Sequence, residues 1–196
     1  ALGGFDDDAS TKALLAMLAE KEDEYNLVPK GFAVMSLGRL GGKQALAALL
    51  VLADERSAKG HYKSQEKLES PTRGYAALAL GLYARPMETR QGPYDRPRHQ
   101  RALDLRAARL ADGDEKLEMR TACAVALGLA GRTESLPKLQ AVAGKLGKRD
   151  ELIAGYLLLA RGMLGDSGMI KPAARLLREA NDDTSVAGIL ARRAAV

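Results

Sequence analysis

A short apolar segment recurs four times along this chain of 196 residues, and this repetition constrains the fold more than any other feature. The four copies are KGFAVMSLGRLGG (30–42), RGYAALALGLYAR (73–85), RTACAVALGLAGR (120–132) and AGYLLLARGMLGD (154–166). The glycine column that the copies share consists of Gly38, Gly81, Gly128 and Gly162. Self-similarity at intervals of roughly 20–50 residues is typical of repeat architectures. The chain is therefore expected to consist of similar units that pack on one another.

Two further columns support the alignment. An aromatic residue fills one column in three copies, as Phe32, Tyr75 and Tyr156, and is expected to pack between neighbouring units. Another column contains a cation in three copies, as Lys30, Arg73 and Arg120. These cations are expected to bridge to an acid or a carbonyl of the neighbouring unit. A basic stripe along the array is the alternative.

Each unit is predicted to be a pair of helices. The segments KQALAALLVLADE, TESLPKLQAVAGKL and SGMIKPAARLLREA follow three of the copies and contain a second helical pattern. Aromatic residues are only 4% of the chain and Trp is absent, so Ala and Leu must form the core, which favours closely packed helices. One such hairpin cannot bury its apolar stripe alone, whereas stacked hairpins can.

The residues between paired helices are typical of helix ends. Gly41, Gly131 and Gly165 are expected to end the first helices with positive φ. The second helices are expected to begin near a polar cap or a proline in the first turn. The candidate caps are Thr133, Ser135 and Ser167, and the prolines are Pro137 and Pro172.

This pattern resembles the HEAT-like repeats of the bacterial phycobilisome-lyase type, and RGYAALALGLYAR, MRTACAVALGLAGRTESLPKLQAV and GYLLLARGMLGDSGMIKPAARLL carry the resemblance. The resemblance implies an all-α fold, a right-handed α-solenoid of helical hairpins. Residues 1–196 would form a single array of about four complete repeats with partial repeats at both ends, either a fragment of a longer array or one with unusual caps. Repeats of this type occur in scaffolds, chromophore lyases, hydroxylases and nucleic-acid binders alike, so the resemblance does not select a function.

Two inserts interrupt the regular spacing, because the four glycines are 43, 47 and 34 residues apart. One insert, 54–72, lies between successive units, and the other, 85–101, lies between the two helices of one unit. Turns within units and connections between units line opposite edges of such a stack, so the inserts are expected to project from different edges. The only two histidines, His61 and His99, are thereby separated.

The second insert is rich in arginine and contains an aromatic residue, a combination that suits recognition of phosphate or carboxylate groups. Its candidate partner-binding residues are Arg85, Arg90, Tyr94, Arg96, Arg98, His99 and Arg101. The alternative is a solvated loop whose arginines pair with local acids and with the acidic segment ADGDEKLE (111–118).

The sequence lacks the residue sets of several enzyme classes. No His-Glu dipeptide is present for a di-iron site, and one cysteine with two distant histidines does not suit zinc. There is no phosphate-binding glycine loop. Cys123 lies in an apolar helical segment and is expected to be a buried small hydrophobe. The chain is therefore expected to be no enzyme, with no catalytic residues, no cofactor and no metal site.

The leading functional hypothesis is a non-enzymatic scaffold that binds a protein or peptide on its curved surface. Candidate exposed residues of the second helices are Lys43, Gln44, Arg101, Lys138, Gln140, Lys171 and Arg175. The main alternative is binding of a DNA backbone through the arginine-rich insert, which the net charge of +5 permits. A weaker alternative is a lyase-type enzyme of the same repeat class.

No apolar run is long enough to span a bilayer. The chain opens with Ala1 in place of Met, so the sequence leaves both the cytoplasm and export after N-terminal processing open. It leaves the oligomeric state open as well.

Overall fold

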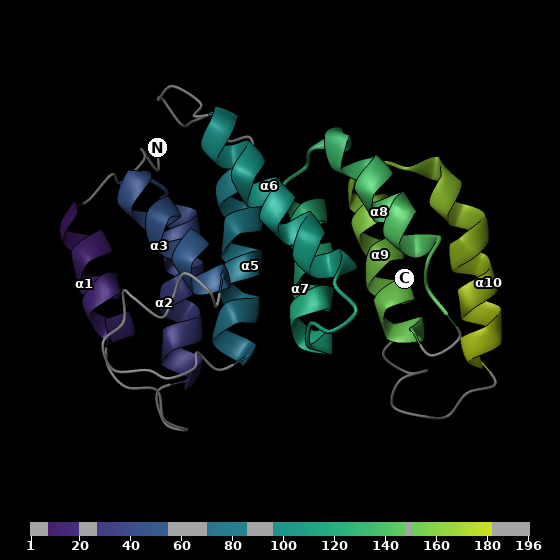
Figure 1. Ribbon diagram of the computed structural model, residues 1–196, viewed down its shortest axis with the longest axis horizontal. Helices are drawn as coiled ribbons and strands as arrows, with labels where there is room; N and C mark the ends of the chain where they lie inside the picture. Colours follow the sequence, from purple (N-terminus) through teal and green to yellow (C-terminus); the bar gives the residue numbers. More distant parts are fainter. Residues whose placement is uncertain (1–7, 20–26, 55–69, 86–95, 148–149, 182–196) are drawn as a thin grey trace.

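The computed structural model describes residues 8–19, 27–54, 70–85, 96–147 and 150–181, and every regular element in these ranges is helical (Figure 1). The α-helices are α1 (Asp8–Ala19), α2 (Leu27–Leu40), α3 (Lys43–Ala53), α5 (Ser70–Ala84), α6 (Arg96–Ala111), α7 (Leu117–Leu129), α8 (Leu136–Ala143), α9 (Glu151–Met163) and α10 (Ile170–Asn181). Two 3-10 turns, Thr133–Ser135 and Ser167–Met169, precede α8 and α10. The predicted all-α class is confirmed.

The helices pack in chain order, and we divide them into two rows. The first-helix row consists of α2, α5, α7 and α9, which contact one another in that sequence (Figure 1). The second-helix row consists of α3, α6, α8 and α10, and each of α3, α6 and α8 also contacts the first helix of the following unit. This arrangement is consistent with the predicted helical array.

The glycine column brings neighbouring first helices to backbone contact. A Cβ on Gly38 would lie 2.5 Å from the carbonyl oxygen of Ala79, and a Cβ on Gly81 would lie 2.6 Å from that of Ala126. A Cβ on Gly128 would lie 2.9 Å from Cα of Ala160. Because a side chain would occupy this space, the helices approach so closely only where glycine is present. Three of the four aligned glycines thus occupy equivalent environments.

The fourth glycine of the column differs. A Cβ on Gly162 would meet the side chain of Met169 at 3.2 Å, and the described chain contains no further first helix beyond α9. The aromatic column packs between units where Tyr75 of α5 covers Gly31 of α2, whose Cβ would lie 2.6 Å from the tyrosine ring. Phe32 of the same column is exposed.

The turns within units confirm the predicted glycines. Gly41, Gly131 and Gly165 have φ values of 81°, 64° and 73°, which L side chains rarely adopt. The prolines Pro137 and Pro172 fall in the first turns of α8 and α10, as predicted.

The predicted caps are wrong in detail. Thr133 and Ser167 lie inside the 3-10 turns, and Ser135 stands at the N-cap position of α8 without a side-chain cap. Asp166 is the residue that caps, accepting a hydrogen bond from the backbone N–H of Gly168. Asp166 follows Gly165 and precedes Ser167, so Asp166 and not the serine stands just before the 3-10 turn. At this position its carboxylate can accept the hydrogen bond from the free backbone N–H.

Both inserts are shorter at their C-terminal ends than the predicted 54–72 and 85–101. Helix α5 begins at Ser70 and α6 begins at Arg96, so Pro71 and Pro97 are the second residues of these helices. Proline is tolerated there because the first N–H groups of a helix have no intrahelical acceptor. The prolines therefore mark helix starts where the sequence suggested loop. Residues 55–69 and 86–95 of the inserts lie outside the described residues.

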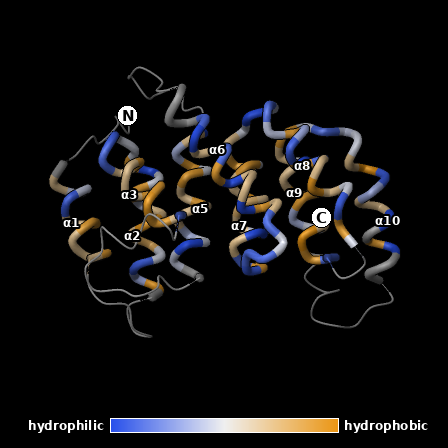
Figure 2. Tube along the Cα trace, in the orientation of Figure 1, coloured by the Kyte–Doolittle hydropathy of each residue, from blue (hydrophilic) through white to orange (hydrophobic). Residues whose placement is uncertain are grey.

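Hydrophobic residues recur along the helices (Figure 2), and the buried ones form two large clusters and a small third one between α9 and α10. One large cluster joins α1, α2, α3, α5 and the start of α6, and includes Leu37, Leu46 and Leu80. The other joins α5, α6, α7, α8 and α9, and includes Leu110 and Leu127. Each unit thus buries its apolar side against its neighbour.

Candidate functional site

The exposed surface of the second-helix row carries most of the residues that the sequence predicted to be accessible. Lys43, Gln44, Arg101, Gln140, Lys171 and Arg175 are exposed, and the side chain of Lys138 is 39% exposed. The acids among the four helices of this row are only Asp104 and Glu179. The second-helix row therefore presents mainly positive charge.

The arginine-rich insert is only partly described. Arg85 is exposed at the end of α5, and Arg101 is exposed in α6. The backbone of Arg96, Arg98 and His99 forms the start of α6, so these residues are helical and not in a loop. Arg90 and Tyr94 lie outside the described residues.

Two of the exposed residues are tied to acids. Lys138 of α8 donates to Oδ1 of Asp104 in α6, which also accepts from the side chain of Gln100 at 3.0 Å. The hydrogen bond from Lys138 lowers the pKa of Asp104, against the opposing effect of desolvation. Gln140 donates to Oδ2 of Asp166 at 3.2 Å. These contacts join successive units across the second-helix row.

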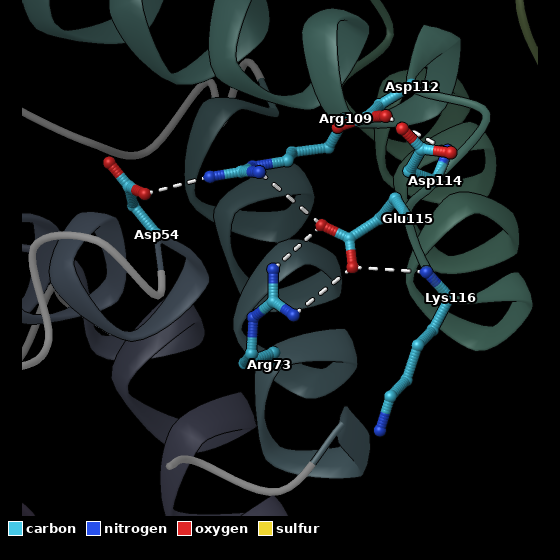
Figure 3. Close-up of polar contacts among 7 residues, drawn as sticks. All are labelled: Asp54, Arg73, Arg109, Asp112, Asp114, Glu115 and Lys116. Carbon is cyan, nitrogen blue, oxygen red and sulfur yellow. Dashed lines mark hydrogen bonds and ion pairs between the residues drawn. The ribbon is translucent and has the colours of Figure 1, made fainter. Parts of the chain in front are cut away.

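A network of partly buried ion pairs connects α5 of the first-helix row with α6 of the second-helix row (Figure 3). Arg73 of α5 donates two hydrogen bonds to the carboxylate of Glu115, at 3.1 and 2.8 Å. Arg109 of α6 lies 3.5 Å from the same carboxylate and donates to Asp54 at 2.9 Å. The side chains of Arg73 and Glu115 are 5% and 7% exposed. Glu115 therefore joins α5, α6 and the turn before α7.

The network changes the acidity of its carboxylate. Burial alone would raise the pKa of Glu115, but the hydrogen bonds from Arg73, the charge of Arg73 and Arg109 and the backbone N–H of Lys116 together lower it below its ordinary value. Glu115 is therefore ionised at neutral pH. Arg73 contacts this carboxylate through two hydrogen bonds, and such bidentate Arg–carboxylate contacts are strong and geometrically fixed.

The cation column forms a structural ladder, as expected, and not an exposed basic stripe. Arg73 pairs with Glu115, which precedes α7, and Arg120 of α7 lies 4.0 Å from Asp150, which precedes α9. Arg120 also donates to the carbonyl oxygen of Leu110 at 3.2 Å. The third member, Lys30, is 1% exposed. The column thus links α5 to the residues before α7, and α7 to the residue before α9.

The structure reveals a buried cation that sequence reasoning missed. Arg106 of α6 is 1% exposed, and none of its three guanidinium nitrogens has a hydrogen-bond partner within the described part of the chain. Burial lowers the pKa of Arg106 to about 10. The signal was present in the sequence, because Leu103, Arg106 and Leu110 share one side of a helix.

Cys123 of α7 is buried, as predicted, and lies near Arg106. Desolvation raises the pKa of the Cys123 thiol to about 12, which outweighs the opposite effect of the Arg106 charge. The thiol is the protonated form at neutral pH, and the thiolate is the form that acts as nucleophile or metal ligand. Cys123 therefore serves packing.

A pocket of about 300 Å³ opens between α6, α7 and α8. Its lining residues are Ala111, Gly113, Arg120, Val142, Lys145, Leu146 and Asp150. The lining includes the ladder pair Arg120 and Asp150 and a further cation, Lys145, but no His, Cys or Ser. Within the described ranges, no group of His, Cys, Asp and Glu is arranged to hold a metal ion.

None of the helices in the described ranges is both long and apolar enough to cross a membrane. Comparison with protein-family models, with curated proteins and with solved structures finds no match to this chain. The structure therefore establishes an all-helical protein whose helices pack in sequence, and the HEAT-like resemblance stays a prediction from the repeated pattern.

Proposed function

We propose that the chain is a non-enzymatic interaction scaffold, a right-handed HEAT-like solenoid whose second-helix row binds an extended acidic segment of another protein. The observation that carries this proposal is the charge of that row. Lys43, Arg101 and Lys171 are exposed on α3, α6 and α10, so positive charge is present on three of the four second helices, and Lys138 of the fourth, α8, is paired with Asp104. A partner that runs across the units would meet one cation after another.

The first-helix row does not offer such a surface. Lys30, Arg73 and Arg161 are 1%, 4% and 9% exposed, and the latter two pair with acids of the chain itself. The pocket beside Arg120 is lined mainly by Ala111, Gly113, Val142 and Leu146, with Arg120 and Asp150 of the ladder and Lys145 as its charged residues. These features support a binding role for the second-helix row in preference to a catalytic site.

A second candidate function is binding of duplex DNA through its phosphates. The observation that favours it is the start of α6, where Arg96, Arg98 and Arg101 fall within six residues with no acid in the first turn. Phosphate-dominated binding loses affinity linearly with the logarithm of the salt concentration, with a slope set by the number of phosphates contacted. A peptide interface with apolar anchors depends less on salt.

The test is a fluorescence anisotropy titration with two labelled probes, a 20-residue peptide rich in Glu and Leu and a 20-base-pair duplex, each at two salt concentrations. We expect the peptide to bind and the triple variant Lys43→Glu, Arg101→Glu, Lys171→Glu to weaken it by about tenfold or more. The charge-matched control, Lys12→Glu, Arg39→Glu, Lys116→Glu, changes cations outside the second-helix row and should bind nearly as the wild type does.

The outcomes separate the two candidates. Tighter binding of the duplex, with a steep salt slope, would replace the peptide proposal by the nucleic-acid one. Equal weakening by both triple variants would show attraction to net charge alone and would contradict a site on the second-helix row.

A further inference from the structure

The pocket between α6, α7 and α8 contains charged and apolar groups that the proposed scaffold function does not use. Its volume of about 300 Å³ is at the lower end of the range for small-molecule sites in proteins. Among the described residues that line it, Arg120 and Lys145 are cations and Asp150 is an acid. The pocket therefore differs in its residues from the exposed surface to which the acidic partner segment is assigned.

The ladder pair at this pocket is looser than the pair between α5 and the turn before α7. Arg73 donates to Glu115 at 2.8 Å, whereas Nη1 of Arg120 lies 4.0 Å from Oδ1 of Asp150. A separation of 4.0 Å is longer than a hydrogen bond. Among the described residues, the side chain of Arg120 donates only from Nε, to the carbonyl oxygen of Leu110. Its terminal N–H groups are therefore available to a ligand in the pocket.

Lys145 supplies the second cation of the pocket. It follows the end of α8, is exposed, and its ammonium makes no ion pair or hydrogen bond with the other described residues. Asp150 already accepts a hydrogen bond at Oδ2, from the backbone N–H of Gly147 at 2.9 Å. Two cations and one acid give the described lining a net charge of +1. One negative charge on a ligand would balance it.

The rest of the described lining is small or apolar. Val142 belongs to the core cluster that includes Leu127, and Leu146 packs against that cluster. Ala111 and Gly113 complete the lining and leave space beside the charged groups. The core thus holds apolar surface next to the two cations, and a hydrocarbon group placed there would be removed from water.

We propose that this pocket binds an aliphatic carboxylate, a small ligand with one negative charge on an apolar body. The planar guanidinium of Arg120 suits a carboxylate, and Lys145 adds a second positive charge. A phosphate monoester fits less well, because it carries about 1.5 to 2 negative charges at pH 7, more than the net charge of the lining. A free aliphatic acid and the last residue of a peptide both present the proposed chemistry.

The probe that tests the proposal is sodium isocaproate, titrated into the isotope-labelled full chain and followed through the backbone amide signals by nuclear magnetic resonance. We expect saturable shifts at Gly113, Leu146 and Gly147, with a Kd of about 1 mM for a ligand of this size. Isocaproamide lacks the charge and acetate lacks the apolar body. Each should bind about fivefold or more weakly than isocaproate.

Variants of the charged residues locate the site. Lys145→Gln should weaken binding of isocaproate by about fivefold or more, and the fold should tolerate it because Lys145 is exposed. The matched control is Lys138→Gln, which removes a cation of α8 that pairs with Asp104 and should leave binding unchanged. Asp150→Asn keeps the shape of the side chain and removes the one negative charge of the lining, so binding should strengthen by about threefold.

A second pair of probes identifies the source of the carboxylate. The tripeptide acetyl-Gly-Ser-Leu presents the same group as the last residue of a chain, and its C-terminal amide is the control. Tighter binding of the tripeptide acid than of isocaproate would support a protein C-terminus as the ligand, and weaker binding would support a free small acid. Equal binding of the tripeptide acid and its amide would overturn the proposal.

Two further results would also overturn it. One is the absence of saturable shifts up to about 20 mM isocaproate, and the other is binding that ignores Lys145→Gln. The triple variant Lys43→Glu, Arg101→Glu, Lys171→Glu should bind isocaproate as the wild type does. Loss of peptide binding to the second-helix row and loss of carboxylate binding to the pocket are therefore distinguishable.

Discussion

The first-helix row and the second-helix row differ in how closely neighbouring helices pack and in whether their cations are buried. First helices approach through Gly38, Gly81 and Gly128 to backbone contact and bury Lys30 and Arg73. Second helices leave Lys43, Arg101 and Lys171 exposed, and their contact across α6 and α8 includes an exposed ion pair. The contrast indicates that the first row holds the fold together, whereas the second row leaves its cations exposed to solvent.

The largest expected effect is at Glu115, which joins the two rows. Glu115→Gln removes the charge that Arg73 and Arg109 share and leaves two cations with reduced compensation in a buried site. Breaking a buried ion pair in this way should cost about 3 kcal/mol of the free energy of unfolding. Urea denaturation of both proteins at neutral pH measures the difference. A loss below about 0.5 kcal/mol, the range of surface substitutions, would show that the network does not hold the rows together.

The same substitution gives a pH prediction. The folded-state pKa of Glu115 lies below its ordinary value of 4.5. Its contribution to stability is therefore fully present above pH 4.5 and is lost as the pH falls through the folded-state pKa. The difference in stability between wild type and Glu115→Gln should be constant from neutral pH to about 4.5 and shrink below it. A difference that grows on acidification would mean that the sign of the pKa shift is wrong.

The next largest loss of stability is expected where neighbouring helices of the first-helix row approach each other most closely. Gly81→Ala places a Cβ 2.6 Å from the carbonyl oxygen of Ala126, so the helices must separate, at a cost of about 2 kcal/mol. The matched control is Gly144→Ala at the end of α8, where the new Cβ would meet no atom closer than 3.6 Å and φ is −68°. That control should be neutral or slightly stabilising. Thermal unfolding experiments measure both variants. Equal losses of stability in Gly81→Ala and Gly144→Ala would contradict the idea that close packing distinguishes the first-helix row from the second-helix row.

Substitution of Arg106 tests how a buried cation on the inward side of the second-helix row affects stability. The repeat pattern places Arg106 of α6 where α3 has Leu49, which is fully buried. Arg106→Leu should therefore stabilise the protein, because it removes a buried charge that lacks compensation. We expect a gain of only about 1 kcal/mol, since the shorter leucine leaves part of the volume unfilled and the resulting cavity offsets some of the stabilisation. Arg101→Leu, on the exposed side of the same helix, is the control and should change stability little. Destabilisation by Arg106→Leu would indicate that the guanidinium has a compensating partner.

The smallest effect is expected at the exposed pair between Asp104 and Lys138. Their side chains are 55% and 39% exposed. Exposed ion pairs contribute little, so Asp104→Asn should lower the free energy of unfolding by about 0.5 kcal/mol, and less at high salt. Chemical denaturation at two salt concentrations measures this. A loss equal to that of Glu115→Gln would show that the second row supports the fold as strongly as the first.

Much of the fold was readable from the sequence because the repeated residues have strict steric roles. Gly38, Gly81 and Gly128 share one environment, and Gly41 and Gly131 end helices with positive φ. Only glycine fits these close contacts, so the repeated glycines are visible as a column when the copies are aligned. The caps and the ends of the inserts were less accessible, since local polar contacts and helix-start prolines shift boundaries by a few residues.

The candidate site was less predictable than the fold. The cation column was expected to bridge to acids, but the identity of Glu115 and Asp150 as partners depends on how the units stack. The alternative in which the arginines of the insert pair with the acidic segment 111–118 is not tested, since Glu115 of that segment pairs with Arg73 and with Arg109, which lie outside the insert. The burial of Arg106 needed the register of its helix, which composition and charge do not reveal.

By itself the sequence determined the helical class, the two helices of each unit and the positions where neighbours touch, because periodicity and glycine placement are local properties of the chain. Only the tertiary structure decided which cations are buried and which are exposed. It also showed that Phe32 is 70% exposed, whereas Tyr75 of the same column packs on Gly31 and is 36% exposed. Exposure depends on what the neighbouring unit places against a side chain, and no single repeat contains that information.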